Sequence, residues 1–435
     1  MKKRSKINIV TLGCSKNLVD SEHILAQLHA AGFAVTYDSN DTDARIVIIN
    51  TCGFIGDAKE ESINTILEFV QAKEHGLIDQ LFVIGCLSER YADQLRDEIP
   101  EVDDYFGVRD INEIVVRLTG GWREELKTSR FITTPNHYAY LKISEGCNWR
   151  CAYCAIPLIR GPHVSVPMDV LLDEARKLAQ QGVKELIIVG QDTTYYGIDL
   201  YGKRMLADLL RKLAEIEQIQ WIRLHYTYPT GFPQDVIDVM RTEPKVCRYI
   251  DIPLQHIADS QLSAMKRGID RATTEDLMER LRREVPDIAI RTTLMVGFPG
   301  ETQQDFDELV EFVRQQKFDR LGVFAYSEEE GTPAAELCDN VPEDVKNNRV
   351  DKIMNIQREI SLQSNTQRIG KTLRVVIDRI EGDYYIARSE FDSPEVDQEL
   401  LIKVDECPTP FVPGDFTTVT VTDCEEYDLY ASPTV

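Results

Sequence analysis

The sequence lacks any apolar run long enough to cross a membrane. No stretch approaches the roughly 18 apolar residues that a spanning helix requires. Residues 2–4 are basic, but the apolar segment at 7–12 is too short for the core of a signal peptide and instead predicts a strand. These absences lead us to expect a cytoplasmic protein with no membrane partner.

Positive charge is also scarce, and the sequence contains no internal repeat and no low-complexity segment. Its 49 lysines and arginines face 73 aspartates and glutamates, which gives a net charge of −24. Proteins that coat nucleic acid need basic surfaces to pair with phosphates, so this composition argues against a direct nucleic-acid substrate. It suits a basic partner, although an acidity that serves only solubility remains the alternative.

The first part of the chain alternates strand-like and helix-like patterns. A length of 435 residues, 43% of them hydrophobic, allows two or three domains with their own cores. Alternation of this kind predicts an open parallel sheet with crossover helices, which we place at residues 5–121. Strands are expected at 7–12, 34–37, 45–50, 81–84 and 104–106, with helices at 19–31 and 57–73. A less regular linker follows at 122–135.

The same alternation then restarts and yields six βα units, which predict a full or partial (β/α) barrel at 133–366. Its strands are expected at 140–143, 185–189, 221–225, 249–252, 290–296 and 320–325. Its helices are expected at 168–181, 205–217, 234–241, 274–284, 302–315 and 342–369. The fold class is therefore α/β, with the active site at the carboxyl ends of the barrel strands. From 367 to 435, short β-rich runs at 373–377, 384–387, 400–404 and 416–423 predict a small β-barrel.

Three of the ten cysteines are spaced C-x3-C-x2-C, directly after the predicted strand at 140–143. These are Cys147, Cys151 and Cys154. Three thiolates on one short loop can hold a 4Fe–4S cluster and leave its fourth iron open to a cofactor or substrate. A zinc site is the alternative, but zinc prefers four ligands in paired spacing, and no fourth Cys or His lies close by in the sequence.

Three further cysteines, Cys14, Cys52 and Cys86, each follow a different predicted parallel strand. The carboxyl ends of such strands line one crevice, so we expect these thiols to meet at one edge of the sheet. A glycine beside each cysteine lets the backbones approach closely; the three are Gly13, Gly53 and Gly85. The pattern predicts a second 4Fe–4S cluster, and three unrelated buried cysteines are the alternative.

The loop at 147–154 resembles the signature of the radical S-adenosylmethionine (SAM) superfamily. With a three-cysteine N-terminal domain and a small C-terminal domain of the TRAM type, nearly the whole chain is similar to the methylthiotransferase family. The segments that carry this resemblance are LGCSKNLVDSE (12–22), NTCGFI (50–55), GCL (85–87), IPLIRG (156–161), DIPLQH (251–256), GFPGE (297–301) and FAYSEEEGT (324–332). One departure follows Gly161, where the family usually shows Ser-Arg-Pro and this chain has HVSVP (163–167), so no role is given to that arginine.

The resemblance implies two 4Fe–4S clusters and SAM as cofactors. In the family, the cluster of the 147–154 loop cleaves SAM to a 5′-deoxyadenosyl radical, and the aromatic residue at the position of Tyr153 packs near the adenine. The second cluster carries a sulfur that one SAM methylates. A second SAM supplies the radical that abstracts hydrogen from the target carbon, which then captures the methylthio group. An electron donor and a sulfur donor are implied as partners.

Further contacts to SAM are expected after the second barrel strand. The superfamily often places contacts to the methionine part of SAM there, at the positions of Gly190, Gln191 and Asp192, although a simple helix entry would look the same. Gln255 and His256 end the fourth strand and are either contacts to SAM or substrate, or packed core residues. No catalytic side chain is assigned beyond the clusters, and the remaining cysteines are expected to be inert: Cys247, Cys338, Cys407 and Cys424.

The resemblance favours, as substrate, an aspartate β-carbon of ribosomal protein uS12, free or within the small subunit. The predicted C-terminal domain holds six Lys and Arg against fifteen Asp and Glu, which suits a basic protein better than tRNA. Acidic residues of this domain could attract that partner, or could simply form a solvated loop: Asp392, Glu395, Asp397 and Glu399. Two alternatives stay open, a tRNA adenosine methylthiotransferase of the same family and a non-catalytic iron–sulfur carrier.

Overall fold

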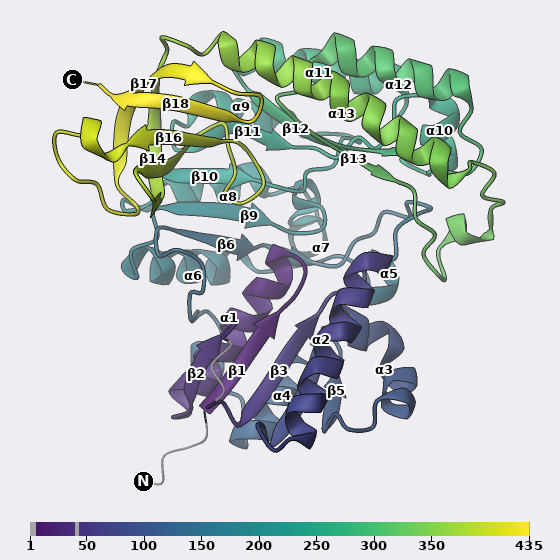
Figure 1. The fold of residues 1–435 in the computed structure, drawn as a ribbon, viewed down its shortest axis with the longest axis vertical. Coiled ribbons are helices and arrows are strands. Elements are labelled where there is room, and N and C mark those ends of the chain that lie inside the picture. Colours follow the sequence, from purple (N-terminus) through teal and green to yellow (C-terminus); the bar gives the residue numbers. More distant parts are fainter. Residues whose placement is uncertain (1–5, 40–42, 435) are drawn as a thin grey trace.

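The computed structural model describes residues 6–39 and 43–434, so the predicted domain limits at 5 and 435 lie outside the described residues. The described chain forms three bodies (Figure 1): an α/β domain at the bottom, an incomplete barrel in the middle and a small β-barrel at the upper left. Within these residues, no helix has both the length and the apolar character to span a membrane.

The N-terminal domain is built on five parallel strands in the order β2-β1-β3-β4-β5. They are β1 (Lys6–Thr11), β2 (Ala34–Tyr37), β3 (Ile46–Thr51), β4 (Gln80–Gly85) and β5 (Asp104–Phe106). Alternate apolar residues of β3 and β4 enter two separate cores, one on each face of the sheet, as expected for a covered parallel sheet. All five predicted strands are present.

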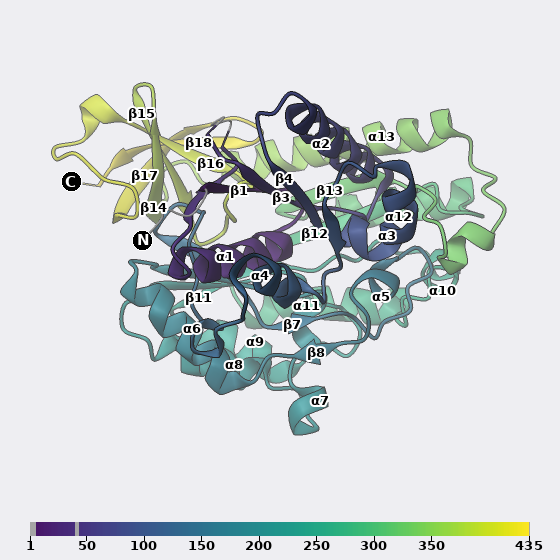
Figure 2. The same ribbon diagram turned by 90° about the horizontal axis from the view of Figure 1, so that it is seen from below.

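Four helices cover this sheet, two on each face (Figure 2). α1 (Ser15–Ala30) and α4 (Ile111–Thr119) lie on one side, and α2 (Gly56–Glu74) and α3 (Cys86–Glu98) on the other. The two helices named from the sequence as examples correspond to α1 and α2, and no ranges were given for α3 and α4. α3 is strongly charged and buries few of its side chains, and α4 has only nine residues, so neither offers a long apolar period.

The central domain is a six-stranded parallel sheet in the order β13-β12-β11-β10-β9-β6. Its strands are β6 (Tyr138–Lys142), β9 (Glu185–Val189), β10 (Trp221–Leu224), β11 (Val246–Asp251), β12 (Ala289–Val296) and β13 (Arg320–Ala325). The described residues pair β6 and β13 with one neighbour each, so the barrel is partial, which confirms the predicted fold class.

The central sheet is covered on its outer face by helices whose apolar residues form the largest core of the protein. These helices are α6 (Met168–Gln180), α8 (Leu206–Ala214), α9 (Gln234–Thr242), α11 (Arg271–Glu284), α12 (Gln303–Gln316) and α13 (Glu343–Thr366), with short α5 (Ile156–Ile159), α7 (Ile198–Tyr201) and α10 (Asp259–Ala264). The short strands β7 (Ser144–Glu145) and β8 (Val164–Ser165) pair antiparallel. The alternate residues of β6 and β9 pack against α1 of the N-terminal domain.

The C-terminal domain is a closed five-stranded barrel in the order β14-β15-β16-β18-β17. Its strands are β14 (Thr372–Glu381), β15 (Tyr384–Ser389), β16 (Glu399–Lys403), β17 (Phe416–Cys424) and β18 (Asp428–Pro433). The sequence predicted four of them and missed β18, a six-residue strand that contains a proline. That strand closes the barrel by pairing with both β16 and β17.

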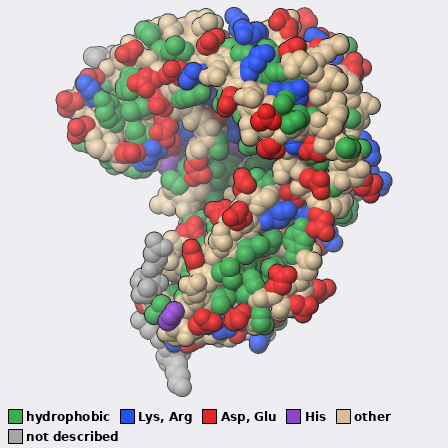
Figure 3. Space-filling model, turned by 45° about the vertical axis from the view of Figure 1, so that its right-hand side comes forward, with side chains coloured by type: hydrophobic (Ala, Val, Ile, Leu, Met, Phe, Trp, Pro, Cys, Tyr) green, Lys and Arg blue, Asp and Glu red, His purple; other side chains and the backbone are tan. Residues whose placement is uncertain are grey.

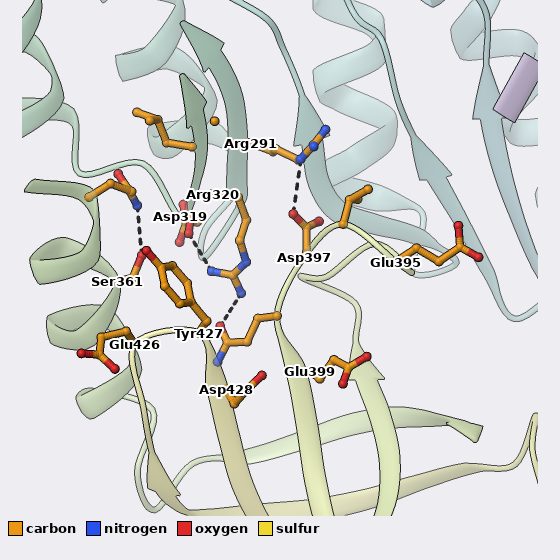
Figure 4. Close-up of a pocket in the computed structure, with 15 residues that line it drawn as sticks. Arg291, Asp319, Arg320, Ser361, Glu395, Asp397, Glu399, Glu426, Tyr427 and Asp428 are labelled. Atoms are coloured by element: carbon orange, nitrogen blue, oxygen red, sulfur yellow. Dashed lines mark hydrogen bonds and ion pairs between the residues drawn. The ribbon is translucent and has the colours of Figure 1, made fainter. Parts of the chain in front are cut away.

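The connection between β15 and β16 (residues 390–398) ties this small barrel to the central one. Side chains of several central strands bond to it: His225 Nε2 lies 2.8 Å from Ser393 Oγ, Tyr249 Oη donates to Asp397 over 2.7 Å, and Tyr138 Oη donates to Glu395 over 2.9 Å. A pocket of about 440 Å³ remains beside this connection, lined by Arg291 and Arg320 (Figure 4).

The prediction that acidic residues of this connection attract a basic partner is wrong for Asp392 and Asp397. Asp392 is 3% exposed and pairs with Arg320, while the Asp397 side chain is 1% exposed and pairs with Arg291 over 3.3 Å. A buried carboxylate whose charge is neutralised by a neighbouring arginine does not attract a distant partner. Their role is to fix the domain in place.

Candidate functional site

Cys14, Cys52 and Cys86 lie at the carboxyl ends of three neighbouring strands, β1, β3 and β4. The loops that carry them are in close contact. A Cβ atom on Gly13 would lie 2.8 Å from Cys52 Cβ, and one on Gly53 would lie 2.8 Å from the carbonyl carbon of Cys86. Only glycine allows this approach, so the sequence keeps the three cysteine loops together at one edge of the sheet.

The three thiols of this N-terminal triad differ in the direction in which their surroundings shift the pKa. Burial raises the pKa of Cys86 to about 11, against the opposing charge of Arg160, and burial also raises the pKa of Cys52. Burial acts the same way on Cys14, but the charges of Lys16 and Arg160 outweigh it and lower the pKa of that thiol. Cys14 is therefore the thiol most readily deprotonated, and metal binding would release protons from the other two.

Cys147, Cys151 and Cys154 lie on the loop between β7 and α5. Backbone bonds fix this loop: Cys147 N donates to Gly161 O over 3.0 Å, and Cys154 N donates to Cys151 O over 3.1 Å. Burial raises the pKa of both Cys147 and Cys154 to about 12. In a low-dielectric site of this kind, positive iron is the natural means of stabilising the thiolates.

Cys151 has two polar neighbours that sequence reasoning missed. Tyr228 Oη lies 3.3 Å and Arg267 Nη1 lies 3.4 Å from its sulfur. Arg267 Nη1 also lies 3.2 Å from Tyr153 Oη, and the Trp149 ring stacks on Tyr228 at 4.2 Å. No sequence spacing identifies Tyr228 and Arg267 as neighbours of Cys151, because both come from loops far from it along the chain. Hydrogen bonds to ligand sulfurs are one of the ways in which a protein sets a cluster's potential.

The segment Gly190-Gln191-Asp192 leaves β9 beside this loop. Asp192 accepts from Thr194 N over 2.8 Å and from Trp149 Nε1 over 2.6 Å, so its carboxylate is already used inside the protein. Gln191 donates to Glu145 over 3.0 Å, and its own Oε1 is buried without a hydrogen-bond partner among the described residues. Gln191 is therefore the residue of this segment with an acceptor free for a ligand.

The His256 side chain is already used inside the protein, whereas the structure fixes only the backbone of Gln255. The His256 side chain is fully buried, its Nδ1 accepts from Ala258 N over 3.0 Å, and its Nε2 lies 3.3 Å from Glu301 Oε1. Both ring nitrogens are occupied, which is the packed-core alternative for this residue. Gln255 has a left-handed backbone (φ 73°) and bridges to Leu294.

Arg160 joins the two cysteine triads. It follows the 147–154 loop, yet its Nη2 lies 3.6 Å from Cys86 Sγ and its Nη1 donates to Glu145 over 2.8 Å. Lys142 also donates to Glu145, over 2.8 Å, and both cations pair with Asp20 on α1. Figure 3 shows the molecule hollowed between the N-terminal domain, below, and the C-terminal barrel, at the upper left. Cys86 of the N-terminal triad and the segment that follows the 147–154 loop thus meet at one interface.

Each triad offers three thiols and no other ligand type. Among the residues that the structure describes, no three His, Cys, Asp or Glu side chains converge closely enough for one metal ion. A 4Fe–4S cluster is wider than one ion, so its ligands do not converge on a point, and soft thiolates select iron–sulfur clusters or zinc. Three thiolates without a fourth ligand fit a cluster with one open iron better than zinc.

Comparison with protein families finds three matches along the chain. Residues 6–107 match the Uncharacterized protein family UPF0004, residues 141–313 match the Radical SAM superfamily, and residues 369–433 match the TRAM domain. Two curated relatives are both named ribosomal protein uS12 methylthiotransferase RimO. The one from Bacteroides thetaiotaomicron is 55% identical over 99% of this chain and 98% of its own length. The one from Flavobacterium johnsoniae is 53% identical over 99% and 98%.

Solved structures share the fold at low sequence identity. The radical SAM methyltransferase TsrM from Kitasatospora setae, solved with cobalamin and a 4Fe–4S cluster, has a TM-score of 0.56 at 16% identity and covers 76% of this chain and 77% of its own. The cobalamin-dependent SAM radical enzyme OxsB has a TM-score of 0.51 at 11% identity, over 82% and 56%.

Proposed function

Because this chain belongs to the RimO family of ribosomal protein uS12 methylthiotransferases, we propose that it transfers a methylthio group to an aspartate β-carbon of uS12. The observation that carries this function is the identity of more than half the residues over almost the entire length of such relatives. The chain is a radical SAM enzyme, and membership of that superfamily implies SAM and a 4Fe–4S cluster.

We assign the SAM-binding cluster to Cys147, Cys151 and Cys154. When bound, the cluster supplies the electron that cleaves SAM. The protein's contribution is to hold the ligands: Arg267 and Tyr228 contact Cys151, which is the buried cysteine of the three. We place the methionine part of SAM beside Gly190 and Gln191, where Gln191 Oε1 is a free acceptor for its ammonium group, and the adenine near Tyr153.

Gln191→Ala is expected to weaken SAM binding roughly 10- to 150-fold, because a buried acceptor that bonds an ammonium contributes roughly 1.5–3 kcal/mol. Asp192→Asn should change affinity far less, since that carboxylate already bonds Thr194 and Trp149. Anaerobic calorimetry of the iron-loaded protein measures the affinity for SAM. The matched control is Gln181→Ala, the same substitution at an exposed glutamine. Unchanged affinity in Gln191→Ala would remove this residue from the SAM site.

We assign a second 4Fe–4S cluster to Cys14, Cys52 and Cys86, as the carrier of the sulfur to be transferred. The support is their placement on neighbouring strands, the close contact of their loops and the purely thiol donor set. An external electron donor and an external sulfur donor complete the reaction, and a ribosomal substrate implies a cytoplasmic enzyme. We retain domain limits at 5–121, 133–366 and 367–435.

Mass spectrometry of uS12 and of bulk tRNA, from cells with and without this gene, tests the substrate. We expect the methylthio mass on one uS12 aspartate to disappear while tRNA stays unchanged. Loss of a methylthio-adenosine instead would favour the tRNA alternative. SAM-dependent formation of 5′-deoxyadenosine by the purified protein separates both enzymes from a non-catalytic iron–sulfur carrier.

A further inference from the structure

One buried lysine near the cysteine triads has no anionic partner. Lys16 is only 6% exposed, and among the described residues no carboxylate lies within 4.0 Å of its ammonium and no oxygen or nitrogen accepts from it. The other buried lysine of the described chain, Lys346, pairs with Asp339 over 2.6 Å. The ammonium carries three donors and is not among the fully enclosed polar atoms of the described residues, so a ligand can reach it.

The position of Lys16 places its charge at the boundary between the N-terminal domain and the barrel domain. It lies in the first turn of α1, two residues after Cys14, and its Nζ is 3.2 Å from the centre of the Tyr226 ring. Tyr226 lies two residues after the end of β10, and Tyr228, two residues further on, contacts Cys151 over 3.3 Å. The side chain therefore crosses from the N-terminal domain to the barrel domain.

The carboxylates nearby are already used by other cations. Asp20 and Glu145 pair with Lys142 and Arg160, as described above. No sulfur atom of the described chain is within hydrogen-bonding distance of Lys16 Nζ, whereas Arg160 does contact Cys86. Among the described residues this positive charge thus faces the Tyr226 ring and acts on the nearby Cys14 thiol, and no carboxylate neutralises it.

We propose that Lys16 binds the side-chain carboxylate of the target aspartate and so determines which residue is modified. This inference rests on the proposed function. In aspartate the β-carbon, which is the reacting carbon, is bonded directly to the side-chain carboxyl carbon. A carboxylate held by Lys16 therefore also fixes the position of the reacting carbon. An adenine or a side-chain amide carries no negative charge and would leave the ammonium unpaired.

The test compares full-length uS12 with its variant in which the target Asp is replaced by Asn, against wild-type enzyme, Lys16→Met and Lys16→Arg. Wild-type enzyme, loaded with iron and sulfide, is expected to bind the Asp form roughly 100-fold more tightly than the Asn form. Lys16→Met should bind both forms about equally, and Lys16→Arg should keep part of the preference. Exposed Lys212→Met on α8 is the matched control and should behave as wild type.

Iron content and the electron paramagnetic resonance spectrum of each variant separate this role from one in charge balance at Cys14. Unchanged iron and spectra together with lost Asp/Asn discrimination support the proposal. An altered N-terminal cluster signal with equal weakening of both uS12 forms, or a wild-type preference in Lys16→Met, overturns it. Failure of the wild-type enzyme to modify the Asp form would instead overturn the proposed function itself.

Discussion

Cys151→Ala is expected to abolish SAM cleavage, with 5′-deoxyadenosine formation falling roughly 1000-fold or more. Without this thiolate the 147–154 loop has two ligands left, and Arg267 and Tyr228 lose the sulfur that they contact. The measurement is deoxyadenosine produced from SAM under a strong reductant, by chromatography. Methylthiolation of uS12 should be lost in the same variant, because both the radical and its cofactor site are gone.

The control for this experiment is Cys338→Ala, since Cys338 is exposed and belongs to neither triad. It should retain wild-type deoxyadenosine formation and wild-type iron content. Appreciable SAM cleavage by Cys151→Ala would mean that the superfamily loop is not the site of SAM chemistry in this protein.

Cys14→Ala is expected to separate the two half-reactions. SAM cleavage should persist within about twofold, because none of the contacts around Cys147, Cys151 and Cys154 involves Cys14, while methylthiolation of uS12 should be undetectable. Iron content should fall by about four atoms per chain if a whole 4Fe–4S cluster is lost. The three readouts are deoxyadenosine, the methylthio mass on uS12, and iron and sulfide analysis of the reconstituted protein.

Two results would contradict the separate roles of the triads. Loss of SAM cleavage in Cys14→Ala would show that the N-terminal triad is needed for SAM chemistry itself. Retained methylthiolation would show that these cysteines do not carry the transferred sulfur. The first result would have a physical route through Arg160. This residue contacts Cys86 and lies on the segment that follows the 147–154 loop.

Local sequence patterns were sufficient to predict the three-part architecture. Parallel strands buried on both faces appear as short apolar runs, and the alternation of such runs with helical periods predicts crossover connections. The sequence analysis gave no range for α3, which is highly charged, for α4, which is short, or for β18, a six-residue strand that contains a proline. The cysteine motifs were recognisable because the loop at 147–154 is continuous, and because Cys14, Cys52 and Cys86 each follow a strand.

The sequence by itself therefore determined the fold class, the two sets of three cysteines and the resemblance to the methylthiotransferase family. Only the tertiary structure decided which side chains surround those cysteines, since Arg267, Tyr228 and Arg160 reach them from other segments. It also showed Asp392 and Asp397 to be buried partners of arginines rather than surface charges. The physical reason is that ion pairing and burial depend on contacts between distant segments, which no local pattern of residues records, and the unpaired charge of Lys16 became visible for the same reason.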